Sequence, residues 1–557
     1  MTTYEGRLEL TWTNKGQRLL AHEDGSYEWV PPSDYRVAEV RLLHDMSTVG
    51  EVGKTRAGDN LLIRGDALNA LTSLARLPEF ASEYLGKVKL CYIDPPFNTQ
   101  QSFLQYDDNL EHSVWLTMIR DRLLQIRDLL APEGSVWLHL DDSEMHRARC
   151  VLDEIFGPDK FVATILWQKR YSRDNRPAIG AVHDYILVYS PIGDQWKHHR
   201  NRLTRLAAKE YRNPNNDPRG DWRAIPMTAQ GWRPNQMYEI TAPGGKVHTP
   251  PKGRCWSMIR ARYEELLAEG RIYFGKDNNS QPGVIRYLDE DEGIVPWTWW
   301  PSDEVGHTDE SKKEMLSLFP ESEAFDTPKP ERLMQRIIEI GSSPGEIVLD
   351  CFLGSGSTAA VAHKMQRRWV GVEWSINILN TYTLPRLSKV AGGKDNGGVT
   401  ELTGWSGGGG FRVLEVAPSM FEADGGLVFL ADWMTNGALA EATAAQLGFT
   451  YENEPPFSGR KGRSRLAVID GVVNESVVRL IVAALPEKER VVICGTGIDT
   501  EARPILRELR RGSTLRKIPA ALLDEYRSGR QLRLEITEAV EDSNGSRARH
   551  ETAEAKA

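Results

Sequence analysis

The residues whose types and spacing could do chemistry begin at Asp94. In the segment "KLCYIDPPFN" an apolar run ends in this carboxylate, and Pro95, Pro96 and Phe97 follow it directly. Proline fixes φ near about −65° and carries no N–H, so two prolines hold the backbone beside the acid in one conformation. The simplest explanation is a buried strand that ends in a rigid loop. The alternative is a loop that presents an acid and a ring to a ligand.

A second candidate site lies in "EIVLDCFLGSGSTAAVAHKMQRRWVGVE", residues 346–373. Gly354, Gly356 and Ala359 have the G-x-G-x-x-A spacing, and a predicted strand ends in Glu373. Glycines let the backbone approach a ligand, and an acid in this place can accept both hydroxyls of a ribose. A tight turn without a ligand and a nicotinamide site both remain open. Asp350 and the Ser-Thr pair in the loop favour a ligand with a polar amino-acid end over a pyrophosphate.

Regular elements place both segments at strand ends. Strands are expected at 60–65, 88–94, 135–140, 183–190, 346–350 and 368–373, and an amphipathic helix is expected at 113–130. A further helix at 141–157 is predicted to be capped by Asp141 or Asp142. Such alternation predicts an α/β fold, a doubly wound and mostly parallel sheet with helices on both faces.

Composition fits a globular protein of 557 residues, with 40% hydrophobic and 26% charged residues. No apolar run reaches the roughly 20 residues that span a bilayer, and the N-terminus has no signal pattern. The five cysteines are scattered without a C-x-x-C pair, which predicts no metal site and favours a reducing cytoplasm. The net charge of −9 argues mildly against nucleic acid unless the basic residues cluster.

The basic residues do cluster. From Lys197 to Arg223 there are eight Lys or Arg against three Asp or Glu, and seven of the sixteen tryptophans lie between 196 and 300. Further on, "GWSGGGG" (404–410) is typical of a flexible joint. Strand-like segments beyond it predict a small separate α/β domain.

Two motifs together, "DPPF" at 94–97 and "DCFLGSGST" at 350–358, resemble those of the DNA amino-methyltransferases. The first motif precedes the second by 256 residues, which resembles the circularly permuted beta class. "LIRGDAL" resembles the family's segment that holds the cofactor adenine, and "TPKPERLMQRII" resembles its cofactor-side helix. "HDYILVY" and "VGHTDESKKEM" are similar to text in the modification subunits of Type III restriction–modification systems. The resemblance covers about 58–415. Phe97 stands where Tyr is commoner, and Ser357 where Thr is often seen.

The resemblance implies a role for each motif residue. It implies that S-adenosylmethionine is the cofactor and that the chain is a site-specific, adenine-specific DNA methyltransferase. The implied catalytic residues are Asp94, Pro95, Pro96 and Phe97. The implied cofactor-binding residues are Asp66, Leu68, Lys329, Asp350, Phe352, Gly354, Ser355, Gly356, Ser357, Thr358 and Glu373. The basic block supplies candidate DNA-binding residues, Arg200, Arg202, Arg205, Arg212, Arg219 and Arg223.

The expected reaction moves a methyl group to the N6 amino group of a flipped adenine in duplex DNA. Asp94 and the Pro95 carbonyl would each accept one N–H of that group, and Phe97 would stack on the base. An acid at the start of the motif favours adenine over cytosine N4, where Ser is typical. The alternatives are an N4-cytosine or RNA methyltransferase, or a catalytically silent specificity subunit for a separate nuclease. His139, His183 and His112 are expected to have structural roles.

The predicted domains follow from these assignments. They are an N-terminal extension (1–55), the catalytic half of the methyltransferase domain (56–195), a target recognition domain (196–312), the cofactor-binding half (313–417), a C-terminal α/β domain (418–535) and a disordered tail (536–557). The expected partner is duplex DNA, in a prokaryotic cytoplasm near the nucleoid and away from membranes. A homodimer and a separate restriction subunit with helicase and nuclease activity remain open.

Overall fold

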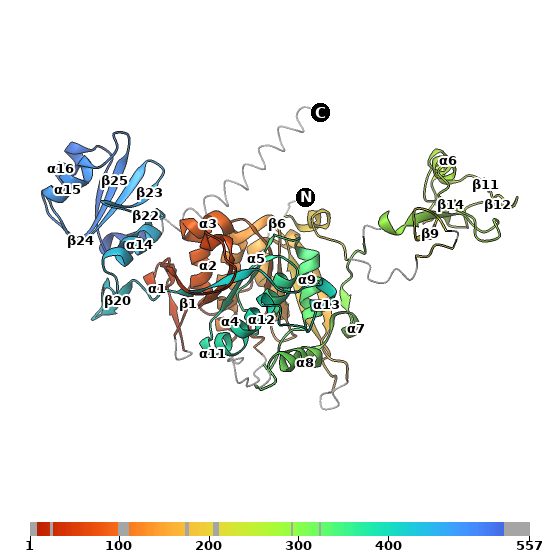
Figure 1. The fold of residues 1–557 in the computed structure, drawn as a ribbon, viewed down its shortest axis with the longest axis horizontal. Helices are drawn as coiled ribbons and strands as arrows, with labels where there is room; N and C mark the ends of the chain where they lie inside the picture. The colour runs from red at the N-terminus through yellow and green to blue at the C-terminus, as the bar shows by residue number, and fades with distance from the viewer. Residues whose placement is uncertain are drawn as a thin grey trace. The chain divides into compact units, whose positions relative to one another are not determined.

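A computed structural model (Figure 1) describes residues 8–22, 26–98, 111–172, 178–203, 211–214, 216–290, 293–321 and 325–527. The chain forms two compact units. The second unit is Arg202–Pro296, and the first consists of the chain on either side of it.

The first unit contains a ten-stranded sheet in the order β16-β7-β8-β6-β5-β17-β18-β4-β19-β3. From β6 to β19 in this order each strand is parallel to the next, and β16 is parallel to β7. β8 is antiparallel to β7 and β6, and β3 is antiparallel to β19. The predicted α/β fold with a mostly parallel sheet is confirmed. The strands are β3 (Leu43–Gly50), β4 (Asn60–Arg64), β5 (Val88–Ile93), β6 (Leu130–Leu140), β7 (Phe161–Gln168), β8 (His183–Tyr189), β16 (Trp299–Trp300), β17 (Ile347–Asp350), β18 (Arg368–Glu373) and β19 (Gly410–Val416).

Helices pack on this sheet in two groups, with α4 against α2 and α5, and α10 against α9 and α12. They are α1 (Tyr35–Ala38), α2 (Ala67–Arg76), α3 (Pro78–Tyr84), α4 (His112–Leu129), α5 (Met145–Phe156), α7 (Ser302–Val305), α8 (Thr308–Leu318), α9 (Glu331–Gly341), α10 (Ser357–Lys364), α11 (Ile376–Ile378), α12 (Leu384–Ala391) and α13 (Thr400–Thr403). None of the helices that the structure describes is both long and apolar enough to span a bilayer.

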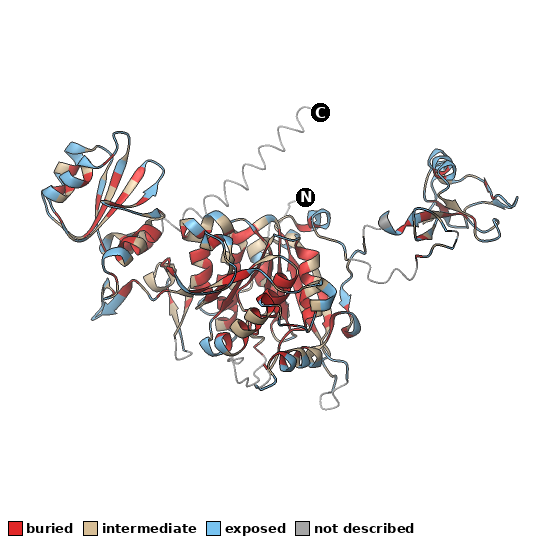
Figure 2. Cartoon of the chain, in the orientation of Figure 1, coloured by how far each residue is buried: buried red, intermediate tan, exposed pale blue. Residues whose placement is uncertain are grey.

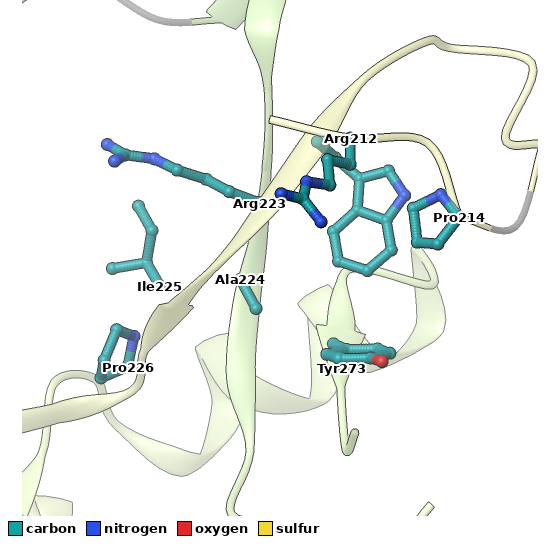
Figure 3. Close-up of a pocket in the computed structure, with 8 residues that line it drawn as sticks. Arg212, Pro214, Arg223, Ala224, Ile225, Pro226 and Tyr273 are labelled. Atoms are coloured by element: carbon teal, nitrogen blue, oxygen red, sulfur yellow. The ribbon is translucent and has the colours of Figure 1, made fainter. Parts of the chain in front are cut away.

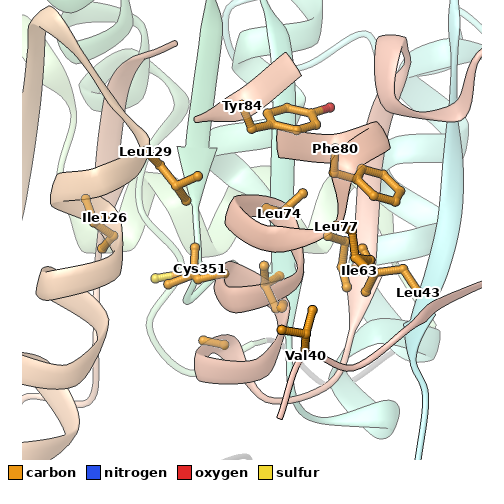
Figure 4. Close-up of a cluster of buried hydrophobic side chains, with 14 of the residues drawn as sticks. Val40, Leu43, Ile63, Leu74, Leu77, Phe80, Tyr84, Ile126, Leu129 and Cys351 are labelled. Carbon is orange, nitrogen blue, oxygen red and sulfur yellow. The ribbon is translucent and has the colours of Figure 1, made fainter. Parts of the chain in front are cut away.

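The core follows the predicted apolar spacing. Ile119, Leu123 and Ile126 of α4 are fully buried, as the three- and four-residue steps predict. Figure 4 shows part of this cluster, where side chains of α2, α3 and α4 gather with Ile63 of β4. Buried residues are concentrated in the sheet and in the helices against it (Figure 2). The cap of α5 differs from the prediction, because Glu144 takes the N-cap position and Asp141 instead accepts from the Ser143 amide.

Two expected boundaries do not hold. Residues 1–55 are more than an extension, because β3 pairs with β19 at the sheet edge and the hairpin of β1 (Arg18–Ala21) and β2 (Tyr27–Val30) joins α4 through an Arg18–Asp121 ion pair of 2.9 Å. The run at 404–410 is not a free joint. The Trp405 indole donates to the Val390 carbonyl at 2.8 Å, and a Cβ on Gly410 would lie 2.4 Å from the Val49 carbonyl oxygen. Glycine is needed there for close packing.

The C-terminal block has its own sheet but is docked on the main core. Its order is β22-β23-β24-β25-β26, and Val478, Ile481 and Ile493 lie in a separate apolar cluster. On its other side Gln446 exchanges hydrogen bonds of 3.1 and 2.7 Å with the Val40 backbone. The elements are β20 (Phe421–Asp424), β21 (Leu427–Leu430), α14 (Asn436–Leu447), β22 (Thr450–Glu454), β23 (Phe457–Lys461), β24 (Ser464–Val473), α15 (Glu475–Ala483), β25 (Arg490–Ile498), α16 (Ala502–Leu509), β26 (Thr514–Lys517) and α17 (Ala520–Arg527).

The second unit is narrower than the predicted recognition block of 196–312. Trp196 and Trp300, at the two ends of that block, are buried in the first unit, where both rings lie 6.2 Å from the Trp137 ring. The unit contains a sheet in the order β14-β15-β9 and the hairpin-like pairs β10–β13 and β11–β12. Its elements are β9 (Trp222–Pro226), β10 (Thr228–Gln230), β11 (Ile240–Thr241), β12 (Val247–His248), β13 (Arg254–Trp256), α6 (Arg260–Ala268), β14 (Ile272–Tyr273) and β15 (Gly283–Tyr287).

Candidate active site at the strand ends

Four acids that are distant in the sequence meet at the carboxyl ends of neighbouring strands. β5, β17, β18 and β4 are adjacent and parallel, and Asp94, Asp350, Glu373 and Asp66 lie at or just after their ends. Ligands of open parallel sheets bind at this edge. One cavity of about 1350 Å³ reaches all four acids. Its walls include the predicted residues Asp66, Leu68, Asp94, Pro95, Pro96, Phe97, Lys329, Asp350, Phe352, Gly354, Ser355, Ser357, Thr358 and Glu373.

The loop after β5 is held rigidly. The Trp115 indole of α4 donates a hydrogen bond to the Pro96 carbonyl at 2.6 Å. The neighbouring Pro95 carbonyl does not accept this bond. The Phe97 ring packs on His139 with centroids 5.7 Å apart and planes 30° apart. Proline geometry and these two contacts fix the orientation of the motif before a ligand arrives.

The two oxygens of Asp94 differ. Oδ2 is paired with the Lys329 ammonium, which also lies 5.2 Å from the Phe97 ring centroid. Oδ1 is buried, and within the part of the chain that the structure describes no group donates a hydrogen bond to it. Because a buried acceptor without a donor is costly, Oδ1 marks a place for a ligand N–H or O–H. The Lys329–Asp94 pair was not foreseen, since the two residues lie 235 positions apart.

His139 packs against Phe97 of the motif and contacts two polar side chains. Its Nδ1 lies 2.8 Å from the Tyr92 hydroxyl, and its Nε2 lies 3.4 Å from Asp184 Oδ2. Burial lowers the pKa of His139, so the ring is neutral near pH 7. A neutral, fully buried imidazole packed beneath Phe97 fits the expected structural role.

The glycine loop is hydrogen-bonded to Glu373, the acid at the end of β18. Glu373 Oε2 accepts the Gly354 N–H and Oε1 accepts the Ser375 N–H, both at 2.8 Å. Gly354 and Gly356 have φ of 51° and 81°, which other residues adopt only with strain. Of the predicted cofactor-binding residues, Gly356 is the one that does not line the cavity as described. Burial raises the pKa of Glu373 to about 7 and that of Asp350 to about 7. Both carboxyls therefore favour a ligand that brings hydrogen-bond donors or a positive charge.

A buried ionic cluster behind the loop escaped sequence reasoning. Arg386 of α12 donates to the Ser357 hydroxyl at 2.8 Å and to Glu331 of α9 at 2.8 Å. Lys364 of α10 donates to the other Glu331 oxygen at 2.7 Å and is paired with Asp395 at 2.7 Å. Although burial pushes the pKa of Glu331 up, the charges of Arg386 and Lys364 bring it below its ordinary value. Amphipathic helices give no local signal that such charges point inward.

Asp66 has a clear local role. Its Oδ1 accepts the Leu68 N–H at 2.7 Å as the N-cap of α2, and its Oδ2 accepts from Arg122 at 2.8 Å. Arg122 in turn lies 5.9 Å from the Phe352 ring centroid. These contacts fix one wall of the cavity. Direct binding of a cofactor by Asp66 or Leu68 stays a prediction.

The predicted DNA-binding arginines are not one cluster. Arg200 belongs to the first unit, whereas Arg202, Arg212, Arg219 and Arg223 belong to the second. Arg205 lies outside the described residues. Arg212 and Arg223 line a shallow pocket of about 470 Å³ beside Trp222 and Tyr273 (Figure 3). The guanidinium of Arg219 lies 4.0 Å from the Tyr287 ring centroid and is paired with Asp217, which is a structural arrangement.

Comparison with known proteins agrees with this arrangement. The family described as DNA methylase matches residues 88–383. Since the match covers more than half of the 557 residues, the chain belongs to this family of DNA methylases.

Three relatives show how far the similarity extends. The Mod subunit of the StyLTI Type III restriction–modification enzyme of Salmonella typhimurium is 31% identical over 340 residues, which cover 55% of this chain and 50% of that protein. The Type II methyltransferase M.EcaI of Enterobacter cloacae is 31% identical over 300 residues, 52% of this chain and 62% of that protein. The EcoP15I Mod subunit of Escherichia coli is 26% identical over 431 residues, 64% of this chain and 62% of that protein. The chain thus spans between 50% and 62% of their lengths.

Among solved structures, the PvuII DNA methyltransferase (cytosine-N4-specific) aligns with 64% of this chain and 94% of its own, at 14% identity and a TM-score of 0.33. That likeness is too distant to support any inference.

Proposed function

We propose that this chain transfers a methyl group from S-adenosylmethionine to the N6 amino group of an adenine flipped out of duplex DNA. The observation that carries the proposal is Asp94 Oδ1, a buried acceptor on a residue that lines the cavity, which receives no hydrogen bond from the described residues. An exocyclic amino group is the donor that this oxygen lacks. The loop around Asp94 is fixed by Trp115 and two prolines, so the acceptor is oriented in advance.

An adenine amino group is a poor nucleophile because its lone pair is delocalised into the ring. Asp94 Oδ1 would accept one N–H, and the Pro95 carbonyl, next to the Pro96 carbonyl that Trp115 occupies, would accept the other. Two acceptors on one side draw the nitrogen toward a tetrahedral shape and orient its lone pair. After transfer the methylated nitrogen carries one proton too many, and Oδ1, which already accepts a hydrogen bond from one N–H, would take that proton. Positioning of this kind contributes up to about 7–11 kcal/mol in well-oriented systems.

The residues around the glycine loop fit S-adenosylmethionine, which when bound supplies an electrophilic methyl group on a positively charged sulfur. Glu373 would accept the ribose hydroxyls, because each of its oxygens keeps a lone pair beyond the backbone bond that it accepts. Asp350, Ser355 and Thr358 would face the amino-acid end. Burial holds the pKa values of both acids at about 7, so a cationic ligand with several donors is favoured.

We further propose that the chain acts in a restriction–modification system, near the nucleoid and together with a separate restriction subunit. Support comes from two of the relatives, which are Mod subunits of Type III enzymes. The Type II relative leaves open a solitary modification enzyme. A homodimer stays a prediction.

The test is to express the full chain in cells without DNA methylation and to digest their DNA for mass spectrometry. We expect N6-methyladenine, and long-read sequencing should locate it at one motif. The Asp94→Ala variant should give none. Asp142→Asn, which alters an exposed acid after the neighbouring strand β6 and outside the cavity wall, should behave like the wild type. N4-methylcytosine, or unchanged N6-methyladenine with Asp94→Ala, would contradict the proposal.

A further inference from the structure

Charge is distributed unevenly within the second unit. Residues 202–296 contain 15 Lys or Arg and 12 Asp or Glu, whereas the whole chain has a net charge of −9. From Trp222 to Tyr263 there are seven Lys or Arg and a single acid, Glu239. Most acids of the unit come after Tyr263. The segment that forms β9–β13 is therefore the strongly basic part of the unit. It lies mostly C-terminal to the basic run at 197–223 that the sequence analysis identified.

Trp232 stands in the middle of this basic segment. Its side chain is 69% exposed, the largest exposed fraction of any described tryptophan. A neighbouring strand carries one cation, because Gln230 of β10 pairs with Arg254 of β13, whose exposed guanidinium donates to the Thr228 hydroxyl and carbonyl at 3.0 and 3.1 Å. The Gly231 amide donates to the Gly253 carbonyl at 3.2 Å. Lys252 and Arg233, both exposed, flank the same turn.

The loop that carries Trp232 is fixed. Arg233 donates to the Gln236 side chain at 3.2 Å, and the thiol of the buried Cys255 lies 3.3 Å from the same oxygen. Pro234 opens the short 3-10 turn Pro234–Gln236, which is closed by a bond of 3.0 Å from the Gln236 amide to the Arg233 carbonyl. An indole on such a pinned loop is presented without further ordering of the backbone, which favours binding.

We propose that Trp232 stacks on a base of the bound DNA while Arg233, Lys252 and Arg254 contact the flanking phosphates. The proposal rests on the proposed function and adds the residue in the second unit that touches the DNA. In a duplex a side chain reaches the base faces by insertion at a base step, and an aromatic face stacks on any base there. Lysine and arginine beside it match the phosphate charge. The core of a protein interface is depleted of charged residues, and a tryptophan that anchors one lies in a desolvated pocket. Here the neighbours in the turn are charged residues, glycine and proline.

The first experiment measures binding of the full-length protein to a fluorescent mixed-sequence duplex by anisotropy. Trp232→Ala should weaken binding by about tenfold or more, as loss of one base stack does, whereas Trp232→Phe should retain most of the affinity. Val247→Ala is the matched control, since it removes another exposed apolar side chain of the same unit, 53% exposed. Affinity for S-adenosylmethionine should be unchanged in all three variants, which shows that the first unit folds, and an unchanged pattern of limited proteolysis within residues 202–296 shows that the second unit does.

Salt dependence separates stacking from charge. Arg233→Gln and Lys252→Gln should each lower the slope of log affinity against log salt by up to about 0.9, and Trp232→Ala should leave the slope unchanged. If the wild type methylates DNA and Trp232→Ala binds it equally well, this inference is wrong and the proposed function stands. If Trp232→Ala leaves DNA binding intact and changes only the molecular mass measured by light scattering, Trp232 contacts another protein chain. This inference is then also wrong, and the proposed function stands. A wild type that neither binds nor methylates DNA would overturn both.

Discussion

At the scale of single residues, Asp94 carries two oxygens with different tasks. Lys329 is paired with Oδ2, and Oδ1, to which no described residue donates, is the acceptor proposed for the substrate. The Asp94→Asn variant keeps the shape of the side chain and removes the charge. We expect kcat to fall by about 10²–10³-fold, as when one oriented hydrogen-bond partner is lost from an active site. Affinities for S-adenosylmethionine and DNA should stay within about threefold. Single-turnover methylation with radioactive cofactor measures this, and turnover near that of the wild type would exclude Asp94 from the reaction.

The buried acids Asp350 and Glu373 make cofactor binding depend on pH. In the ligand-free protein burial raises both pKa values to about 7, so each carboxyl is largely protonated below that pH. A cationic, donor-rich cofactor needs the ionised forms. Affinity for S-adenosylmethionine should therefore rise from pH 6 to pH 8, with release of protons. Calorimetry in buffers of different ionisation enthalpy measures the protons, and Glu373→Gln should flatten the dependence.

The same two groups affect stability with a definite sign. A carboxyl whose pKa is raised in the folded state binds more protons there than in the unfolded chain, so stability falls as the pH rises from its ordinary pKa toward 7. The contribution of these two acids should therefore make the ligand-free protein melt at a lower temperature at pH 7.5 than at pH 5.5. Saturating cofactor should reduce the difference. A melting temperature that is equally pH-dependent in the Glu373→Gln variant would contradict this origin.

At the scale of elements, α9, α10 and α12 meet in the ionic cluster that supports the glycine loop. Arg386→Lys keeps a positive charge beside Glu331, but it loses the planar guanidinium that bonds Ser357 and Glu331 at the same time. We expect a several-fold higher KM for S-adenosylmethionine with little change in kcat or melting temperature. Arg386→Met leaves Glu331 with less compensation and should destabilise the fold by about 3–5 kcal/mol. The double variant Arg386→Met with Glu331→Gln should recover much of this stability but not the KM, which separates positioning from folding.

Sequence patterns predicted some elements and not others for physical reasons. β4, β5, α4, β17 and β18 have apolar periodicity or caps within one short window, and each is present. The two-residue strand β16 and the pairing of β3 with β19 depend on contacts between residues more than 130 and 350 positions apart, so no window contains their signal. The acids after the strands were predictable for the same local reason. The pairing of Lys329 with Asp94 and the contacts of Arg386 with Glu331 and Ser357 were not, because each joins separate elements that meet only in the folded structure.

At the scale of the whole molecule, the C-terminal block and the second unit should respond differently to removal. A chain that ends at Ala417 would lose Met420, Leu439 and Tyr526 from the main apolar core, together with the Gln446–Val40 hydrogen bonds. We expect this truncation to aggregate or to melt well below the full chain. A truncated protein as stable as the full chain would show that the block is independent after all.

The second unit, by contrast, should be removable. Leu203 and Ile294 exchange backbone hydrogen bonds of 3.0 and 2.9 Å, so the two ends of the unit lie side by side. Replacing residues 204–293 with a short Gly-Ser turn should therefore leave the first unit folded, because loop closure over such a gap is inexpensive. The described residues that line the cavity all belong to the first unit, and affinity for S-adenosylmethionine should stay within about twofold. DNA affinity and methylation should be lost, since the basic segment and Trp232 are gone. Calorimetry and anisotropy measure the two affinities, and a deletion variant that still methylates its motif would place sequence recognition in the first unit.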